Sequence, residues 1–227
     1  MQLAIDTSTD TASLALVQES RILSEFTWHC GQNHTVELFP RLEFMLFKTG
    51  FKIEDLDCIF VARGPGSFNG LRVGVSAAKG LAFTLGLPII GVSTLEATAY
   101  QHAESGLAVC AVQNAGREEI AAALYQKKPR KGWSQIAAEH LTTVPALISE
   151  IKGKTIFCGE FNAATAAQIK KLFKSEALLP TPAGNLRRAA YIAELGEIRR
   201  QRGEFDNLGA FQPTYLRKPP ITERKKA

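Results

Sequence analysis

The stretch of sequence that decides the fold is residues 58–86, CIFVARGPGSFNGLRVGVSAAKGLAFTLG. It begins as an apolar strand, turns through a glycine-rich segment at residues 63–70, and continues as a helical run of small and apolar residues. Backbone N–H groups at such a helix start can meet an anion, and the glycines also let the helix pack closely on its strand. The turn is not a P-loop, because no GK[ST] follows, and Asn69 occupies the place of the third glycine of GxGxxG. A tight packing turn and a phosphate site therefore both stay open.

Residues 1–102 follow the order βββαβαβα. Apolar runs predict three strands at QLAIDT, TASLALVQ and RILSEFTW, a helix over 34–49, the strand CIFVAR with its helix, the strand PIIGVS and a helical stretch over 95–102. The second half restarts this plan with LAVCAVQNAGREEIAAALYQ, followed by a strand at KTIFCGE and helices near 143–151, 162–174 and 187–202.

Two such halves predict an α/β protein with a two-lobed actin-like, Hsp70-like fold. The lobes are expected at 1–104 and 105–227, because HAESG at residues 102–106 breaks the pattern with polar and small residues. The second lobe is the more degraded one, and we expect the last helix and the tail to pack back on the first. This architecture normally closes around ATP.

The composition fits an ordinary globular protein. Its 227 residues, 45% of them hydrophobic, are enough to bury a core in each lobe. MQLAIDTSTD at the start has neither a signal-peptide nor a membrane-span pattern, so we expect a cytoplasmic protein without membrane contact. The four cysteines lie far apart without CxxC spacing and are expected to be buried, reduced thiols: Cys30, Cys58, Cys110 and Cys158.

The charge is basic but mild. A net charge of +5 and a pI near 9.1 permit contact with RNA or with an acidic partner without establishing either. Much of the excess lies in the last eleven residues, which are either a solubilising end or a nucleic-acid contact. The basic residues of this tail are Arg217, Lys218, Arg224, Lys225 and Lys226.

Catalytic residues are not evident from the spacing. The four histidines form neither an HxxxH nor an HExxH pair, so no metal site is expected. An actin-like ATPase needs a carboxylate after the first strand of each lobe to organise magnesium. Asp6 fits that position, but Asn114 stands at the matching turn of the second lobe. Asp6 therefore either braces its turn through the Thr7, Ser8 and Thr11 hydroxyls or helps to bind phosphate. The candidate phosphate-binding set is Asp6, Thr7, Ser8, Gly64, Gly66, Ser67 and Gly70.

The helix over 34–49 is apolar over most of its circumference. One arc contains Leu38, Phe39, Leu42, Met45 and Leu46, and a second contains Val36, Phe44 and Phe47. Because one arc suffices to cover a sheet, the surplus indicates either a partner surface or burial within a larger lobe. Pro40 predicts a kink or a late helix start near Phe39. The next helix spaces Gly70, Gly74, Ala78 and Ala82 four residues apart, a smooth ridge over which another helix can pass.

The glycine turn and its surroundings resemble one family. RGPGSFNGLRVGVSAAKGLAFTLGLPIIGVSTLEA is similar to the signature region of the TsaB (YeaZ) family, with Asn69 in place of the usual threonine. LAIDTST, the segment from His34 to Pro40 and the closing stretch 213–217 resemble that family too. The likeness is close over residues 1–103 and loose over the last fifteen.

This resemblance implies a partner role without catalysis. TsaB proteins serve TsaD, which transfers a threonylcarbamoyl group to the adenosine beside the anticodon of ANN-decoding tRNAs, together with the ATPase TsaE. TsaD holds a metal with an HxxxH pair, where this chain has Thr94 and Thr98, and the family usually has an aspartate where Asn114 stands. The resemblance implies a heterodimer with TsaD, a homodimer without it, and tRNA contact only within the complex. No cofactor is required, although ATP or ADP at the partner interface is compatible with the family.

The helices over 34–49 and 71–86 are the expected partner surface. The expected contacts are His34, Leu38, Leu42, Met45, Leu46, Arg72, Ala78, Lys79 and Phe83. Two enzymatic alternatives stay open: an actin-like ATPase or small-molecule kinase that closes on ATP, and a peptidase of the M22 type, an older description of the wider family.

Overall fold

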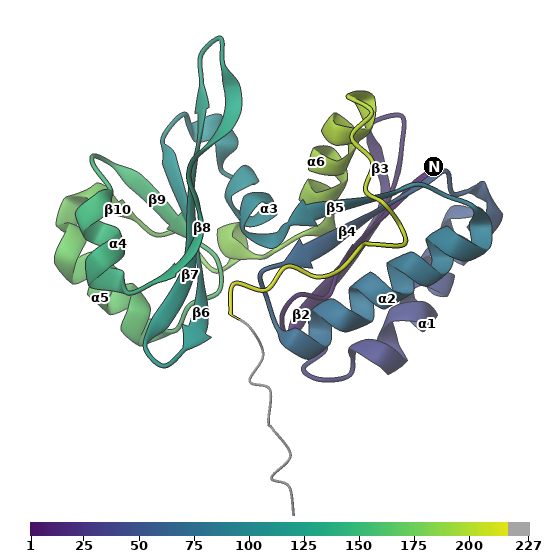
Figure 1. The fold of residues 1–227 in the computed structure, drawn as a ribbon, viewed down its shortest axis with the longest axis horizontal. Helices are drawn as coiled ribbons and strands as arrows, with labels where there is room; N and C mark the ends of the chain where they lie inside the picture. The colour runs from purple at the N-terminus through teal and green to yellow at the C-terminus, as the bar shows by residue number, and fades with distance from the viewer. Residues whose placement is uncertain (218–227) are drawn as a thin grey trace, which may run out of the picture.

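The computed structural model describes residues 1–217, which form two lobes, each built on a five-stranded mixed sheet (Figure 1). The first sheet has the order β3-β2-β1-β4-β5 and the second the order β10-β9-β6-β7-β8. In each sheet a meander of three antiparallel strands is followed by two parallel ones. The predicted duplication and the two-lobed α/β architecture are confirmed.

The strands of the first lobe are β1 (Gln2–Asp6), β2 (Thr11–Gln18), β3 (Arg21–His29), β4 (Cys58–Gly64) and β5 (Ile89–Ser93). Those of the second are β6 (Ala108–Gly116), β7 (Glu119–Lys128), β8 (Gly132–Thr142), β9 (Thr155–Cys158) and β10 (Ala177–Leu178). The sequence pattern missed β8 and β10. β8 has one exposed face and few β-branched residues, and β10 is only two residues long.

The helices are α1 (His34–Thr49), α2 (Phe68–Leu85), α3 (Thr94–Tyr100), α4 (Val144–Glu150), α5 (Ala163–Phe173) and α6 (Ala189–Gln201). Short 3-10 segments lie at Ile53–Asp55, Ala103–Ser105, Lys174–Glu176 and Ala183–Asn185. Of the two outcomes expected at Pro40, the late start near Phe39 is wrong, because the helix already begins at His34 and contains Pro40, and the kink stays a prediction. Gly50 and Gly86, both in the left-handed conformation, end α1 and α2.

Helices cover both faces of the first sheet. Leu3 and Ile5 of β1 point to the face that packs against α1 and α2, whereas Ala4 points to the opposite face, which packs against α6. Gly196 of α6 lies directly on Phe60, and a Cβ there would come within 2.5 Å of the ring. The chain thus returns from the second lobe to complete the first, although the lobe boundary near residue 104 stays a prediction.

α3 joins the two lobes. Ala97 packs with the first sheet, while Leu95 and Ala99 pack with Val109 and Tyr125 of the second. The second lobe's other face is covered by α4 and α5. Because one helix serves both cores, the lobes meet through apolar packing as well as through the chain crossing.

The segment after α6 forms a strap across the first lobe (Figure 1). Phe211 is buried against Gly91, and Lys79 donates a hydrogen bond to the Phe211 carbonyl at 2.9 Å. The Thr214 N–H then bonds to the Arg63 carbonyl at 2.6 Å, and Arg217 reaches Glu119 in the second lobe. The strap, residues 204–217, therefore spans both lobes. The rest of the basic tail lies outside the described residues.

All four cysteines are buried and unpaired, as predicted. Burial raises the pKa of the Cys58 thiol to about 12, and desolvation also raises the pKa values of Cys110 and Cys158. None of the helices within residues 1–217 combines the length and the apolar character that crossing a membrane requires.

We expect Glu96→Gln to stabilise the protein at neutral pH. Burial raises the pKa of the Glu96 carboxyl in α3, and the charge of Glu139 raises it further, while the Trp133 indole N–H donates to Glu96 Oε1 at 3.2 Å. The folded chain therefore binds more protons than the unfolded chain, and its free energy of unfolding falls as pH rises above the ordinary value of 4.5. Glutamine keeps the acceptor and removes the charge.

Urea denaturation at pH 4 and pH 8 checks this. The gain from Glu96→Gln should be present at pH 8 and shrink at pH 4. An equal effect at both pH values would contradict the account.

Candidate functional site

A cleft of about 820 Å³ lies between the two lobes. Its walls come from the β1–β2 turn, the glycine turn before α2, the end of β6, the segment after β9 and the strap. The lining residues include Thr9, Gly66, Ser67, Asn114, Glu160, Tyr215 and Arg217. In an actin-like protein this is the position in which a nucleotide binds, so its polar groups decide what the cleft can do.

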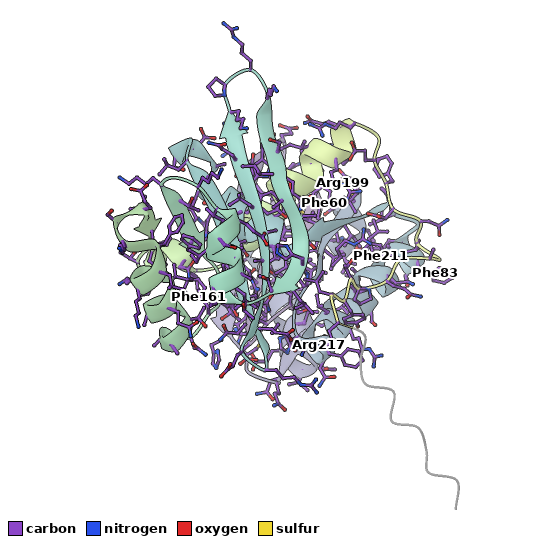
Figure 2. All side chains as sticks on the ribbon, turned by 60° about the vertical axis from the view of Figure 1, so that its left-hand side comes forward. Phe60, Phe83, Phe161, Arg199, Phe211 and Arg217 are labelled. Carbon is purple, nitrogen blue, oxygen red and sulfur yellow. The ribbon has the colours of Figure 1, made fainter. Side chains whose placement is uncertain are left out.

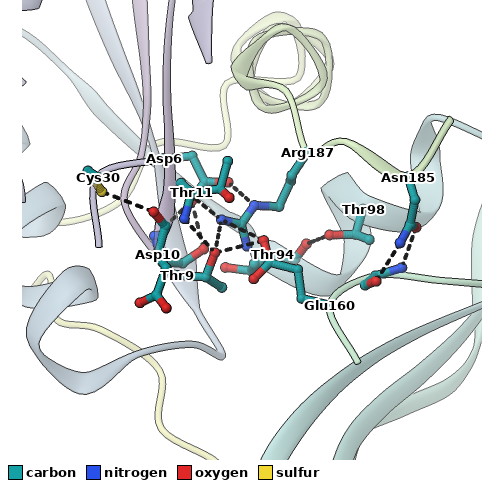
Figure 3. Close-up of polar contacts among 12 residues, drawn as sticks. Asp6, Thr9, Asp10, Thr11, Cys30, Thr94, Thr98, Glu160, Asn185 and Arg187 are labelled. Carbon is teal, nitrogen blue, oxygen red and sulfur yellow. Dashed lines mark hydrogen bonds and ion pairs between the residues drawn. The ribbon is translucent and has the colours of Figure 1, made fainter. Parts of the chain in front are cut away.

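The Asp6 carboxylate at the end of β1 is completely buried and already engaged (Figure 3). Its Oδ1 accepts hydrogen bonds from the Ser8 backbone N–H at 2.9 Å and from the Ser8 hydroxyl at 2.6 Å. Its Oδ2 lies 2.9 Å from Nε of Arg187, as an ion pair. The expected brace is therefore correct for Ser8 and wrong for Thr7 and Thr11, whose hydroxyls do not bond to Asp6.

Arg187 connects the two lobes at this point. Its Nη2 donates to the Thr9 hydroxyl at 2.7 Å and to the Thr11 carbonyl at 2.8 Å. Thr9 in turn donates to Glu160 Oε1, at 2.7 Å, just beyond β9 in the second lobe. Arg187 is 6% exposed, so its charge is compensated almost entirely by Asp6 and, at 3.6 Å, by Glu160. Sequence reasoning missed Arg187, because no local pattern marks a residue 181 positions from its partner.

Asn114 is exposed in the cleft wall, and its contacts are to the second lobe. Its Oδ1 accepts from the Thr165 hydroxyl at 3.2 Å, and its N–H donates to the Glu160 carbonyl at 3.0 Å. It thus holds the start of α5 to the end of β6.

The glycine turn packs tightly on the β1–β2 turn. A Cβ on Gly66 would lie 2.4 Å from the Ser8 carbonyl oxygen, and one on Gly70 would lie 2.1 Å from the Thr7 carbonyl oxygen. Gly64 has φ of +113°, and a Cβ there would lie 2.4 Å from the Thr214 carbonyl oxygen. The Thr7 hydroxyl donates to the Gly70 carbonyl at 2.7 Å. The structure brings all seven candidate phosphate-binding residues together, and the geometry supports the packing-turn alternative; phosphate binding stays a prediction.

The start of α2 is capped internally. The Ser67 hydroxyl accepts from the Gly70 N–H at 3.4 Å, and the Ser67 N–H donates to the Ser8 carbonyl at 2.6 Å. At the start of α3, Thr98 donates to the Thr94 carbonyl at 2.7 Å, and both threonines are buried. Within residues 1–217 there is no group of three or more histidine, cysteine or acidic side chains placed to hold a metal ion.

An apolar groove of about 700 Å³ lies between α1 and α2 on the outside of the first lobe. We call it the α1–α2 groove. Phe39 and Ile53 form one wall, and small and apolar residues of α2 form the other: Val73, Ser76, Ala77, Gly80 and Leu81. Leu38 lies at its floor and Arg72 at its rim.

The structure corrects most of the expected contact residues. Leu42, Met45, Leu46 and Ala78 are buried in the chain's own core and present no surface to a partner. His34 is buried too, and its Nε2 donates a hydrogen bond to the Thr9 carbonyl at 2.7 Å. The ridge of Gly70, Gly74, Ala78 and Ala82 faces β1 and the first core instead of a partner, since close approach to Thr7 requires small residues there. Lys79 is tied to the strap through Phe211.

Three of the four exposed large apolar residues of α1 come from the second arc, which the expected contacts left out, and Phe39 comes from the first. Val36 is 69% and Phe47 77% exposed, and Phe39 and Phe44 are half exposed. Of the expected contacts, Phe83 is 81% exposed and projects from α2 (Figure 2). Arg72 is exposed, with its guanidinium 3.8 Å from the centre of the Phe68 ring. The two arcs were found from the sequence, but the contacts expected on α1 were taken from the first arc, which apart from Phe39 is buried in the core.

The arrangement of two lobes around a central cleft defines an actin-like protein. The ROK hexokinase of Thermus thermophilus shares this fold with a TM-score of 0.52 at 10% identity, covering 88% of this chain and 99% of that one. A Pseudomonas aeruginosa protein described as similar to the peptidase YeaZ superposes with a TM-score of 0.79 at 25% identity, covering 95% and 99% of the two chains.

Sequence comparison narrows the class. Residues 28–219 match the family model described as TsaD, tRNA N6-adenosine threonylcarbamoyltransferase. The tRNA threonylcarbamoyladenosine biosynthesis protein TsaB of Bacillus subtilis is 29% identical over 95% of this chain and 93% of its own length. The chain therefore belongs to the TsaD-like family and, within it, to the TsaB (YeaZ) branch, as the glycine-turn signature predicted.

Two alanine substitutions on α2 test whether the glycine turn is needed for close packing. We expect Gly70→Ala to destabilise the fold by more than about 2 kcal/mol, because its Cβ would overlap the Thr7 carbonyl. Gly80→Ala has nothing within 4 Å of its Cβ and should stabilise the helix by about 0.5–1 kcal/mol. Thermal and urea denaturation measure both. Equal stability of the two variants would remove the packing explanation.

Arg187→Met should destabilise the protein by about 3–5 kcal/mol, because it leaves the Asp6 carboxylate buried without a compensating charge. The double variant Asp6→Asn with Arg187→Met should recover part of that loss, since asparagine still accepts from Ser8. The matched control is Arg202→Met, which removes an exposed pair with Glu204 and should change stability by less than about 1 kcal/mol. A double variant less stable than Arg187→Met alone would contradict the ion-pair account.

Proposed function

We propose that this chain is a non-catalytic partner of the TsaD transferase, bound to it through the α1–α2 groove. Its family membership gives it a role in tRNA threonylcarbamoyladenosine biosynthesis. The partner role rests on one observation: the groove and the phenyl rings beside it form an apolar surface on two adjacent helices. Exposing such an apolar surface to water is unfavourable in free energy, and burial against a second folded chain removes this penalty.

The apolar surface has the composition of a protein interface. Phe39, Phe47 and Phe83 supply large, exposed aromatic area, and aromatic side chains are enriched among the residues that contribute most to binding. Lys48 lies 6.0 Å from the Phe47 ring centre and Arg72 lies over Phe68, so cations border the aromatic groups. This arrangement of an apolar centre and a polar rim supports a protein partner.

The occupant we propose is a second pair of helices of the same kind. The matched segment 28–219 contains both α1 and α2, so a TsaD chain that fits the same family model carries counterparts of them. Two such pairs, packed ridge into groove, form a four-helix contact. The same geometry permits this chain to pair with itself around a two-fold axis when TsaD is absent.

The cleft supports the absence of catalysis. An ATPase of this fold would need the Asp6 carboxylate to organise magnesium, but here Ser8 and Arg187 already use both of its oxygens. Freeing it would require breaking a buried ion pair, at a cost of several kcal/mol. We therefore propose that the chain does not hydrolyse ATP. We also propose that it does not act as a peptidase, that it works in the cytoplasm beside TsaE, and that any nucleotide binds at the partner interface.

Acidic substitutions beside the groove test the partner role. Phe83→Asp and Phe47→Asp should each weaken the complex with the TsaD of the same organism by at least about 2 kcal/mol, roughly thirtyfold, because each places a charge within apolar contact area. Size exclusion with light scattering at 10 µM of each protein reads out the heterodimer.

Leu172→Asp is the matched control, since Leu172 is 45% exposed on α5 of the other lobe. It should leave the heterodimer intact, and unchanged circular dichroism should show that all three variants fold. Wild-type chains that stay separate, or a heterodimer that tolerates both phenylalanine substitutions, would refute the proposal.

A further inference from the structure

The β7–β8 hairpin extends well beyond the body of the second lobe (Figure 1). We call its end, residues 127–132, the basic arm. It has the sequence KKPRKG, and all six residues are exposed. Figure 2 shows the same hairpin standing clear of the other elements from a second direction. Because its residues are exposed, the arm contributes little to the hydrophobic core, and core stability does not explain its conformation or its charge.

Its charge is one-sided. Between Glu119 and Glu139 the chain carries four cations, Lys127, Lys128, Arg130 and Lys131, and no carboxylate. Lys127 is engaged by Glu104 at 2.5 Å. Within residues 1–217 the other three have no acidic side chain within salt-bridge distance. The arm therefore presents three uncompensated positive charges within four consecutive residues.

The arm is held in place from its base. Trp133 stacks on Tyr125 with ring centres 5.5 Å apart and an interplanar angle of 5°, and its indole N–H donates to Glu96. The strand ladder continues to the Lys128–Gly132 pair at the end of the hairpin. There the Lys131 N–H closes the turn on the Lys128 carbonyl at 3.2 Å, with Pro129 at its second position. The charges thus project from a preorganised ribbon, which lowers the entropic cost of binding.

We propose that the basic arm binds the phosphate backbone of an RNA. Closely spaced lysine and arginine side chains neutralise successive phosphates, and such phosphate contacts give affinity without requiring a protein element to enter a groove. A membrane surface fits less well, because the arm exposes no aromatic or long aliphatic side chain to insert into lipid. An acidic protein fits less well too, because the arm lacks an apolar anchor.

The choice of RNA over DNA rests on the proposed function. The inference that the arm binds phosphate groups rests only on its exposed cations. The arm belongs to the second lobe and the α1–α2 groove to the first, and Figure 1 places them at different edges of the molecule. A partner seated in the groove leaves the arm free, so the two sites can be tested separately.

The test compares two full-length triple variants that lose the same charge. The arm variant is Lys128→Gln, Arg130→Gly and Lys131→Gln. Glycine suits position 130, where Arg130 has φ of +66°, so the turn should persist. The control variant is Lys154→Gln, Lys170→Gln and Lys171→Gln, which removes exposed cations elsewhere on the second lobe.

Fluorescence anisotropy with labelled total tRNA, from 20 to 200 mM KCl, measures affinity and its salt dependence. We expect the arm variant to bind roughly tenfold more weakly at low salt, with the slope of log K against log salt smaller by about 2. The control variant should keep most of the wild-type affinity and slope. Both variants should form the TsaD heterodimer as the wild-type chain does.

Four outcomes would overturn the inference. In the first, the wild-type chain shows no RNA binding at 20 mM KCl. In the second, both triple variants lose RNA affinity equally, which would mean that net charge alone determines binding. In the third, the arm variant keeps its RNA affinity but loses binding to vesicles with 30% anionic lipid; in the fourth, it loses the TsaD heterodimer instead. If no heterodimer forms with any variant but the arm variant alone loses RNA binding, the proposed partner role fails and the basic arm remains.

Discussion

The buried ion pair between Asp6 and Arg187 is the interaction on which the rest of the molecule depends. It fixes the end of β1, and through Thr9 and Glu160 it ties the first lobe to the second. The same guanidinium compensates Asp6, which stands where the first lobe of an actin-like ATPase would supply a carboxylate for magnesium. A charge buried at this depth is stable only while its partner stays in place, so the pair resists exchange for a metal ion. One buried ion pair thus both connects the lobes and occupies the carboxylate on which the proposed absence of catalysis rests.

The glycine turn belongs to the same construction. Gly66 and Gly70 bring α2 against the Ser8 and Thr7 carbonyls, in the turn that Asp6 braces, and Gly64 accommodates the Thr214 carbonyl of the strap. The turn that makes the family recognisable is therefore the place where β1, α2 and the chain's last described segment meet. A motif that looks like an anion cradle in sequence is used here for backbone packing, and phosphate binding would need the same absence of a side chain.

Much of the fold was predictable from sequence, and the site less so. Periodicity identified most strands and helices, because alternation and helical spacing are local properties. It also found two apolar arcs on α1, but it could not tell that Leu42 and Met45 face the core while Phe47 faces solvent, since both arcs are equally apolar. Arg187 lies 181 residues from Asp6, and no local pattern links them. The basic run KKPRK of the arm is visible in the sequence, but without an expected β8 nothing placed it at the end of a hairpin.

The duplicated architecture explains why the two proposed surfaces lie on different lobes. Both lobes follow one strand plan, but the first has long crossover helices, 16 residues in α1 and 18 in α2, where the second has 7 in α4 and 11 in α5. The second lobe instead lengthens its hairpin, with 10 and 11 residues in β7 and β8 against 8 and 9 in β2 and β3. A groove able to hold two partner helices needs length along both of its walls, which only the first lobe supplies. A ribbon that reaches beyond the body needs two paired strands that extend past the other strands of their sheet. Among the described residues, β7 and β8 of the second lobe do so. The two lobes thus differ in their crossover helices and in the length of their hairpins, whereas both sheets keep the same strand order.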